Sequence, residues 1–111
     1  MNIEYSEGAK QWGESYALVQ QATESLKEVL GPIHQDVVRG NWARIEDERH
    51  RTLYRLTISD FAGTVVSNFA SDELKQPSHM LVRLSQLWGK LLQVRNWEQR
   101  KELQRIKNLE D

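Results

Sequence analysis

Three histidines are the side chains of this 111-residue chain best suited to acid–base chemistry or metal binding. His34, His50 and His79 stand far apart, and no two of them have the spacing of a metal motif. The chain has no cysteine, which excludes disulfides, thiolate catalysis and zinc–thiolate sites. We therefore expect no metal site.

The most concentrated carboxylates are those of the acidic run 46–48. Two catalytic carboxylates must be held across a cleft in different environments. Neighbours in a turn instead share the same solvent, and the basic residues Arg49, His50 and Arg51 follow directly. We interpret the run as an exposed hairpin tip, and Asp60 as the first residue of a second turn.

The six glycines stand singly, and none belongs to a phosphate-binding loop or a dinucleotide fingerprint. We therefore expect no catalytic residue, no cofactor and no enzymatic activity. Gly89 lies inside an expected helix, where glycine costs roughly 1 kcal/mol relative to alanine. Either another element approaches closely beside Trp88, or the glycine is neutral.

Basic residues gather in the C-terminal part, although the net charge is only −1. The range 80–107 holds two acidic residues and seven basic ones: Arg83, Lys90, Arg95, Arg100, Lys101, Arg105 and Lys107. Mixed charge of this kind is typical of a solvated helix surface. Contact between these seven side chains and a polyanion, above all a nucleic acid, is the alternative.

The elements that position these residues begin with a helix. Apolar residues recur from Trp12 to Leu30 at alternating spacings of four and three, which predicts one helix face. Gly31-Pro32 ends this helix, because glycine adopts the left-handed closing conformation and proline cannot continue the hydrogen bonds. Ile33 is expected just beyond it, completing an apolar contact.

The middle of the chain changes to a period of two. Strands are predicted at 41–46, 51–59 and 63–70, and short turns between them make an antiparallel meander. The sequence 60–63 predicts a type I turn leading into a bulge. Trp42, Leu53 and Val66 fall on the opposite parity to the main apolar face, so we expect apolar surface left over for another chain.

The C-terminal part returns to helical spacing. Ser78 is a plausible N-cap, and Met80, Leu84, Leu87, Leu91 and Val94 form the strongest amphipathic stripe in the chain. The stripe fails after Val94. Asn96 and Gln99 resemble a capping box, which favours a break and a second helix over 97–109. One continuous helix with a polar interruption is the alternative.

The predicted fold is a single α+β domain over 1–111, with an N-terminal helix, a three-stranded antiparallel meander and one or two C-terminal helices (α-β-β-β-α-α). Trp12 and Trp88 fit helix stripes and are expected in the core. Trp42 and Trp97 fit less easily inside, and for these two an interface and the core are open alternatives. Both tryptophans and the weak last helix supply candidate interface residues, because exposed tryptophan often anchors an interface. These candidates are Trp42, Trp97, Leu103, Ile106 and Leu109.

The order of elements and the sequence Gly31-Pro32-Ile33-His34 resemble the double-stranded-RNA-binding domain, whose short Gly-Pro-x-His loop is similar. In that family the loop follows the first strand, whereas here it follows a helix. The lysine-rich start of the family's last helix is replaced by the residues 71–73 and 78–80. We therefore do not assign the chain to the family.

No stretch approaches the roughly 20 apolar residues of a membrane span, and the first residues lack the pattern of a signal peptide. We expect a cytoplasmic protein without a membrane partner. The sequence favours a non-catalytic interaction protein, a small subunit, adaptor or regulator, that binds itself as a homodimer or binds another protein. A nucleic-acid-binding protein is the second hypothesis.

Overall fold

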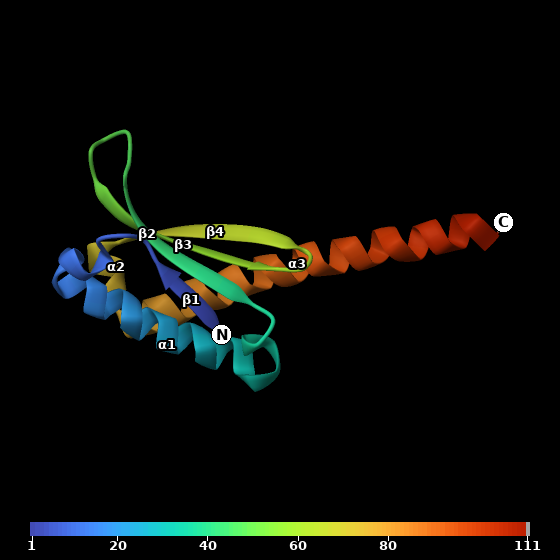
Figure 1. Cartoon of the computed structure of the whole chain (residues 1–111), viewed down its shortest axis with the longest axis horizontal. Helices are drawn as coiled ribbons and strands as arrows, with labels where there is room; N and C mark the ends of the chain where they lie inside the picture. The colour runs from blue at the N-terminus through green and yellow to red at the C-terminus, as the bar shows by residue number, and fades with distance from the viewer. Residues whose placement is uncertain (111) are drawn as a thin grey trace.

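The structure, a computed structural model, describes the backbone of residues 1–110 and their side chains except those of 102 and 106–110. The elements follow in the order β1 (Asn2–Tyr5), a 3-10 turn (Ala9–Trp12), α1 (Glu14–Gln35), β2 (Arg39–Glu46), β3 (Thr52–Asp60), β4 (Gly63–Ala70), α2 (Ser71–Leu74) and α3 (Pro77–Glu110) (Figure 1). The predicted α+β class is confirmed, with its N-terminal helix, meander and C-terminal helices.

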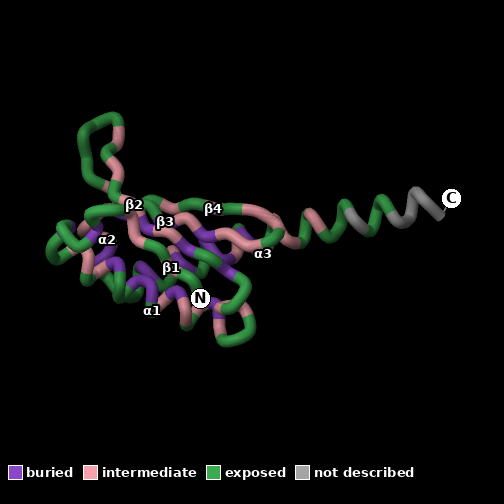
Figure 2. Tube along the Cα trace, viewed as in Figure 1, coloured by how far each residue is buried: buried purple, intermediate pink, exposed green. Residues whose placement is uncertain are grey.

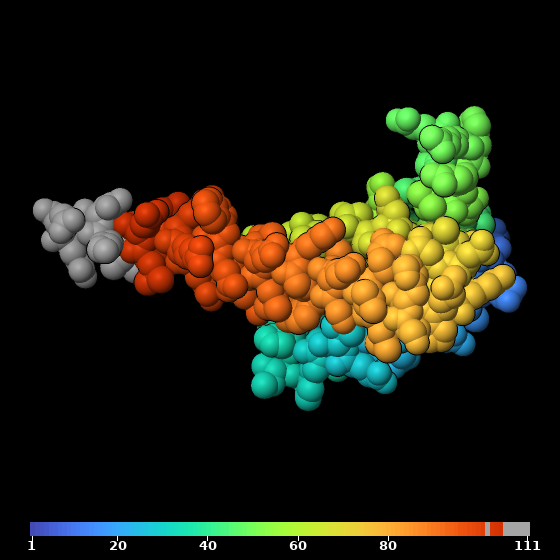
Figure 3. Space-filling model, turned by 180° about the vertical axis from the view of Figure 1, so that it is seen from behind, coloured from blue at the N-terminus to red at the C-terminus, as the bar shows by residue number. Residues whose placement is uncertain are grey.

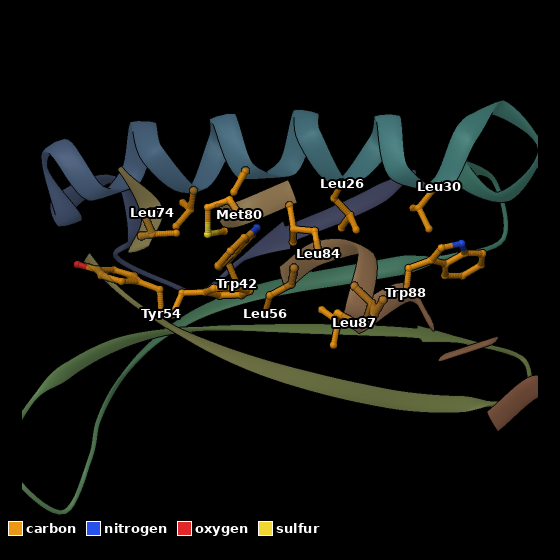
Figure 4. Close-up of a cluster of buried hydrophobic side chains, with 14 of the residues drawn as sticks. Leu26, Leu30, Trp42, Tyr54, Leu56, Leu74, Met80, Leu84, Leu87 and Trp88 are labelled. Carbon is orange, nitrogen blue, oxygen red and sulfur yellow. The ribbon is translucent and has the colours of Figure 1, made fainter. Parts of the chain in front are cut away.

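The sheet has four strands in the order β1-β2-β3-β4, and β1 runs parallel to β2 while the other neighbours are antiparallel. Side chains on one face of the sheet are buried against α1 and α3, which also pack on each other (Figure 4). The helices therefore form one layer and the sheet the other. Among the residues that the structure describes, no helix covers the second face of the sheet.

Strand β1 was not predicted from the sequence, because its four residues are too few to show an alternating pattern. It pairs with β2 in a register that sets Ile3 beside Gly40. A Cβ atom at position 40 would meet the end of the Ile3 side chain, which would have to shift. The Ser6 N–H then donates to the Trp42 carbonyl, at 2.9 Å.

The core lies between the two layers, and the most deeply buried side chains come from α1, β2, β3, β4 and α3. Leu84 and Leu91 have no exposed surface, and Trp12 and Trp88 are each 8% exposed, as predicted. Of the two alternatives for Trp42, the core is the correct one and the interface role is wrong. The register pairs Trp42 with Leu56, so its indole faces the helices and is fully buried.

Helix α1 is interrupted at the predicted place. Gly31 has φ 73° and ψ 168°, a conformation in which a side chain is strained, and one further turn follows to Gln35. The expected contact of Ile33 is wrong, because its side chain is 83% exposed. The kink at Gly31 changes the direction of the helix, so the apolar periodicity of the first part of α1 no longer applies to Ile33.

The predicted break after Val94 is also wrong, since α3 is one helix of 34 residues (Figure 1). The polar stretch 95–102 consists mostly of arginine, lysine, glutamate and glutamine, which are good helix formers without an apolar face. The predicted bulge at the second hairpin is absent as well. Asp60 pairs with Gly63, and the register continues without an offset.

Candidate interaction surface on helix α3

Helix α3 is anchored to the sheet at Arg95. The Arg95 guanidinium donates twice to one oxygen of Asp60, from Nη2 at 2.6 Å and from Nε at 3.1 Å. It also lies 5.4 Å from the ring centres of Phe61 and Trp88. The Asp60 side chain is fully buried and also accepts the Ala62 N–H, at 2.8 Å. Its predicted role in the turn is confirmed, and the ion pair adds a link to α3.

Beyond Arg95 the helix leaves the two layers and continues into solvent (Figures 1 and 2). We call residues 96–110 the α3 extension. Every described side chain in it is exposed except that of Glu98, which is half-buried. Trp97 is 58% exposed and Leu103 is 66% exposed. These two residues, with Arg100 and Gln104, line a shallow hollow of about 400 Å³.

The side of α3 that points away from its own core is open along both the anchored part and the extension (Figure 3). We call it the outer face. It follows helical spacing and comprises Val82, Ser85, Gln86, Gly89, Lys90, Gln93, Asn96, Trp97, Arg100, Leu103 and Gln104. All of these are exposed except Gly89, which is half-buried, and none is acidic. The buried residues Met80, Leu84, Leu87 and Leu91 occupy the opposite side.

Two of the seven basic residues proposed as polyanion contacts are occupied inside the fold. Arg95 pairs with Asp60, as described above. Arg83 forms an ion pair with Glu73 and donates to Ser67 Oγ at 2.8 Å and to the Asn68 carbonyl at 3.0 Å. Its guanidinium also lies 4.6 Å from the centre of the Phe69 ring.

The remaining basic candidates are spread along α3. Lys90, Arg100, Lys101 and Arg105 are exposed, whereas the Lys107 side chain lies outside the described part. The Lys101 ammonium lies 3.8 Å from a Glu98 carboxylate oxygen and 5.6 Å from the Trp97 ring centre.

Of the candidate interface residues, some are exposed on α3 and one is buried in the core. Trp97 and Leu103 come together on the outer face of α3. Trp42 is in the core, where its Nε1–H donates to Thr23 Oγ1 at 2.9 Å. The side chains of Ile106 and Leu109 lie outside the described residues. Trp97 and Leu103 were both recognised from the sequence as interface candidates. The expected helix break concealed that they lie on the same helix as Val82 and Gly89.

The histidines remain apart from one another. His79 lies 2.9 Å from a Glu73 carboxylate oxygen, His50 lies 3.4 Å from Glu46, and His34 packs against the Trp88 ring. Within the described part of the chain, no three His, Asp or Glu side chains come together as a metal site.

The acidic run 46–48 leads from β2 into its turn with β3. Asp47 Oδ1 accepts the backbone N–H groups of Arg49 and Arg51, at 2.9 and 2.8 Å. The N–H of Arg51 is the main cause that lowers the pKa of Asp47, and this outweighs the opposing desolvation. The carboxylate therefore organises the hairpin tip.

The uncovered face of the sheet is a second surface, and it is mixed in character. Val66 is 44% exposed, and Ile45 and Leu53 are half-buried. Polar side chains lie among them, with the Arg55 guanidinium donating to Asn68 Oδ1 at 3.1 Å. This face provides fewer strongly exposed large apolar side chains than α3.

Comparison with known protein families, with curated proteins and with solved structures finds no match to this chain. Within the described residues, no helix has the length and apolar character needed to cross a membrane.

Proposed function

We propose that this chain is a non-catalytic protein-interaction module, a small subunit, adaptor or regulator, that acts as a homodimer. The observation that carries the proposal is the exposure of Trp97 and Leu103 on a helix that continues beyond its own core. Large side chains in this position are typical of an interface anchor.

A physical argument supports a partner for the α3 extension. An isolated helix of about 12–15 residues is marginal in water, and most helical stability in proteins comes from packing of one face. The extension has 15 residues, and the described ones pack little on their own fold. Burial of a large apolar side chain contributes roughly 1.5–3 kcal/mol. A partner that covers Trp97 and Leu103 would therefore stabilise the extension.

The cytoplasm is the compartment we propose, supported by a chain of 111 residues without cysteine. The proposal that the chain is not an enzyme is supported by the roles of its carboxylates. Asp47, Glu73 and Asp60 are engaged in turn and ion-pair contacts that explain their positions.

Sedimentation equilibrium of the full chain over a range of concentrations tests the homodimer. We expect a mass that rises from monomer to dimer. Deletion of 97–111 should leave a folded monomer, with a circular dichroism spectrum that loses only the helix removed. A full chain that stays monomeric at the highest concentration would overturn the proposed homodimer.

Two single substitutions test whether dimerisation depends on the α3 extension or on exposed apolar side chains in general. Trp97→Ala should shift the monomer–dimer equilibrium toward monomer. Ile33→Ala is the control, because Ile33 is an 83% exposed apolar residue outside α3 and should leave the equilibrium unchanged. Equal effects of the two substitutions would contradict the role of the extension.

A further inference from the structure

We propose that the open face of the sheet, opposite the helices, holds a binding site for a free amino acid with a large apolar side chain. Arg39 binds the carboxylate of this ligand, and Glu4 binds its ammonium group. Val37 and Phe61 contact its side chain. The site lies on the sheet and not on α3, so it does not depend on the homodimer proposed above.

A polar hollow lies on this face, at the end where β1 begins. The strand registers set two rows of polar side chains next to each other, Asn2, Arg39 and Ser59 in one and Glu4, Asn41 and Thr57 in the other. These six residues, with Gly40, line a hollow of about 240 Å³. Side chains alternate between the two faces of a strand, so all six lie on the face opposite the buried Trp42.

The two charged side chains of the hollow have opposite signs. Glu4 and Arg39 are diagonal neighbours on β1 and β2, with Cα atoms about 8 Å apart by the usual spacing of strands and residues. Both are exposed, and no ion pair joins them in the described part of the chain. An amino acid carries an ammonium and a carboxylate on one carbon, so each charge can meet its opposite here. A phosphate dianion would be repelled by Glu4.

The neutral side chains of the hollow are available to a ligand. Asn41, Thr57 and Ser59 are half-buried, and among the described residues no side-chain hydrogen bond involves them. Asparagine is depleted in strands, yet Asn41 lies on β2, a central strand between β1 and β3. A residue that breaks a local rule without a gain in packing is typical of a functional site.

A second hollow adjoins the first, and Arg39 and Ser59 line both. It measures about 480 Å³, and its lining includes Val37 and Phe61, which are 50% and 78% exposed. A carboxylate bound to Arg39 therefore lies between the two hollows. The ammonium group then reaches Glu4 in the first hollow, and an apolar side chain covers Val37 and Phe61 in the second. Burial of this apolar surface favours binding.

The lining also sets the preference among ligands. Asp36 is exposed and lines the second hollow, where its carboxylate repels a ligand whose own side chain is acidic. Glutamate should therefore bind more weakly than leucine. Among the described residues that line the first hollow, none is aromatic, although proteins usually hold an unpaired base by stacking it on an aromatic ring. An amino acid thus fits better than a nucleoside.

Titration of leucine into the full chain, followed by backbone amide chemical shifts in NMR spectra, tests the site. We expect saturable shifts near residues 2–4, 37–41 and 57–61. The dissociation constant should be about 0.1–1 mM, because a small ligand makes few contacts in an open hollow. N-Acetyl-leucine lacks the ammonium charge and leucine amide lacks the carboxylate, so each should bind at least about tenfold more weakly.

A pair of arginine substitutions tests the carboxylate contact. Arg39→Ala should weaken leucine binding by at least about tenfold. Arg44→Ala is the matched control, because Arg44 is an exposed arginine of the same strand on the other face of the sheet, and leucine binding should be unchanged. Both side chains are exposed, so both variants should keep the fold and the spread of their amide signals.

The outcomes separate cleanly. Saturable shifts confined to the two hollows, weakened by removal of either ligand charge and by Arg39→Ala, support the site. No saturable shift up to about 10 mM leucine, ten times the weakest expected dissociation constant, overturns it. Equal binding of leucine and N-acetyl-leucine, or equal effects of Arg39→Ala and Arg44→Ala, also overturns it. The homodimer is measured by sedimentation, so its failure and the failure of this site are distinguishable.

Discussion

Leu84 and Leu91 lie one heptad apart on the buried side of α3, and neither has exposed surface. Substitution of either by alanine should lower the free energy of unfolding by about 2–5 kcal/mol, because it removes apolar contacts and leaves a cavity. Urea melts provide the measurement. Val82→Ala is the control on the same helix, where 56% exposure predicts a change within about 0.5 kcal/mol. A loss of that small size at Leu84 would contradict its place in the core.

The contribution of Glu73 to the free energy of unfolding depends on pH. Burial raises the pKa of its carboxyl. Hydrogen bonds from His79 and from the Ala70 N–H, together with the charge of Arg83, lower this pKa by more, so the net shift is downward. A carboxylate whose pKa is lower in the folded state contributes stability above its ordinary pKa of 4.5 and loses it as the pH falls through the folded value.

We therefore expect the unfolding free energy to fall below about pH 4.5, and Glu73→Gln to reduce this fall. The substitution should also lower stability at neutral pH, where the carboxylate is charged and paired with Arg83. Urea melts from neutral pH downward measure both effects. An unchanged pH profile in the variant would show that the ion pair does not contribute.

Individual residues were predictable where a periodic pattern assigned them to a face. The stripe of α3 placed Leu84, Leu91 and Trp88 correctly. Trp42 was not placed correctly, because parity along β2 does not reveal which parity of β3 it will meet. The pairing with Leu56 decides this, and strand register depends on turns and on the core as a whole.

At the scale of elements, two glycines in helices should respond to alanine in opposite directions. Gly31 has φ 73° and ψ 168°, a region that is essentially restricted to glycine, so Gly31→Ala should cost about 1–3 kcal/mol. Gly89 has ordinary helical geometry and free space around a Cβ, so Gly89→Ala should stabilise the monomer by up to about 1 kcal/mol. Thermal or urea unfolding at low protein concentration measures both, and effects of the same sign would contradict the assignment.

The elements themselves were largely predictable. Alternation predicted β2, β3 and β4, and the Gly31-Pro32 pair predicted the interruption of α1. The continuity of α3 was missed because a polar stretch removes the apolar signal while its helix-forming residues keep the backbone helical. Strand β1 was missed because it has only four residues and because its pairing with β2 is a tertiary contact that a local pattern does not contain.

At the scale of the whole molecule, the distribution of charge bears on nucleic-acid binding. Arg83 and Arg95 are held in internal ion pairs, so the exposed basic residues in the described part of α3 are Lys90, Arg100, Lys101 and Arg105. We expect no submicromolar binding of duplex or single-stranded nucleic acid at physiological salt. Titration of labelled probes at low and physiological salt is the measurement, since phosphate contacts make affinity fall steeply with salt.

A control variant makes this titration decisive. Arg100→Ala combined with Lys101→Ala removes two adjacent exposed positive charges from the α3 extension. Submicromolar binding at physiological salt that this double substitution weakens would favour a nucleic-acid-binding protein over the interaction module. Binding seen only at low salt and unaffected by the substitution would reflect general charge.

The contact of Arg83 with the Asn68 carbonyl has a consequence for solubility. Strand β4 is at the edge of the sheet, and an edge strand is a template on which strands of other chains can add. The guanidinium occupies a carbonyl of that edge from the first half of α3, so a strand from another chain would have to displace it. Helix α3 thus occupies one pairing position on the β4 edge, while β1 forms the other edge of the sheet. Damage that unwinds the first turns of α3 would free the Asn68 carbonyl for pairing with a strand of another chain.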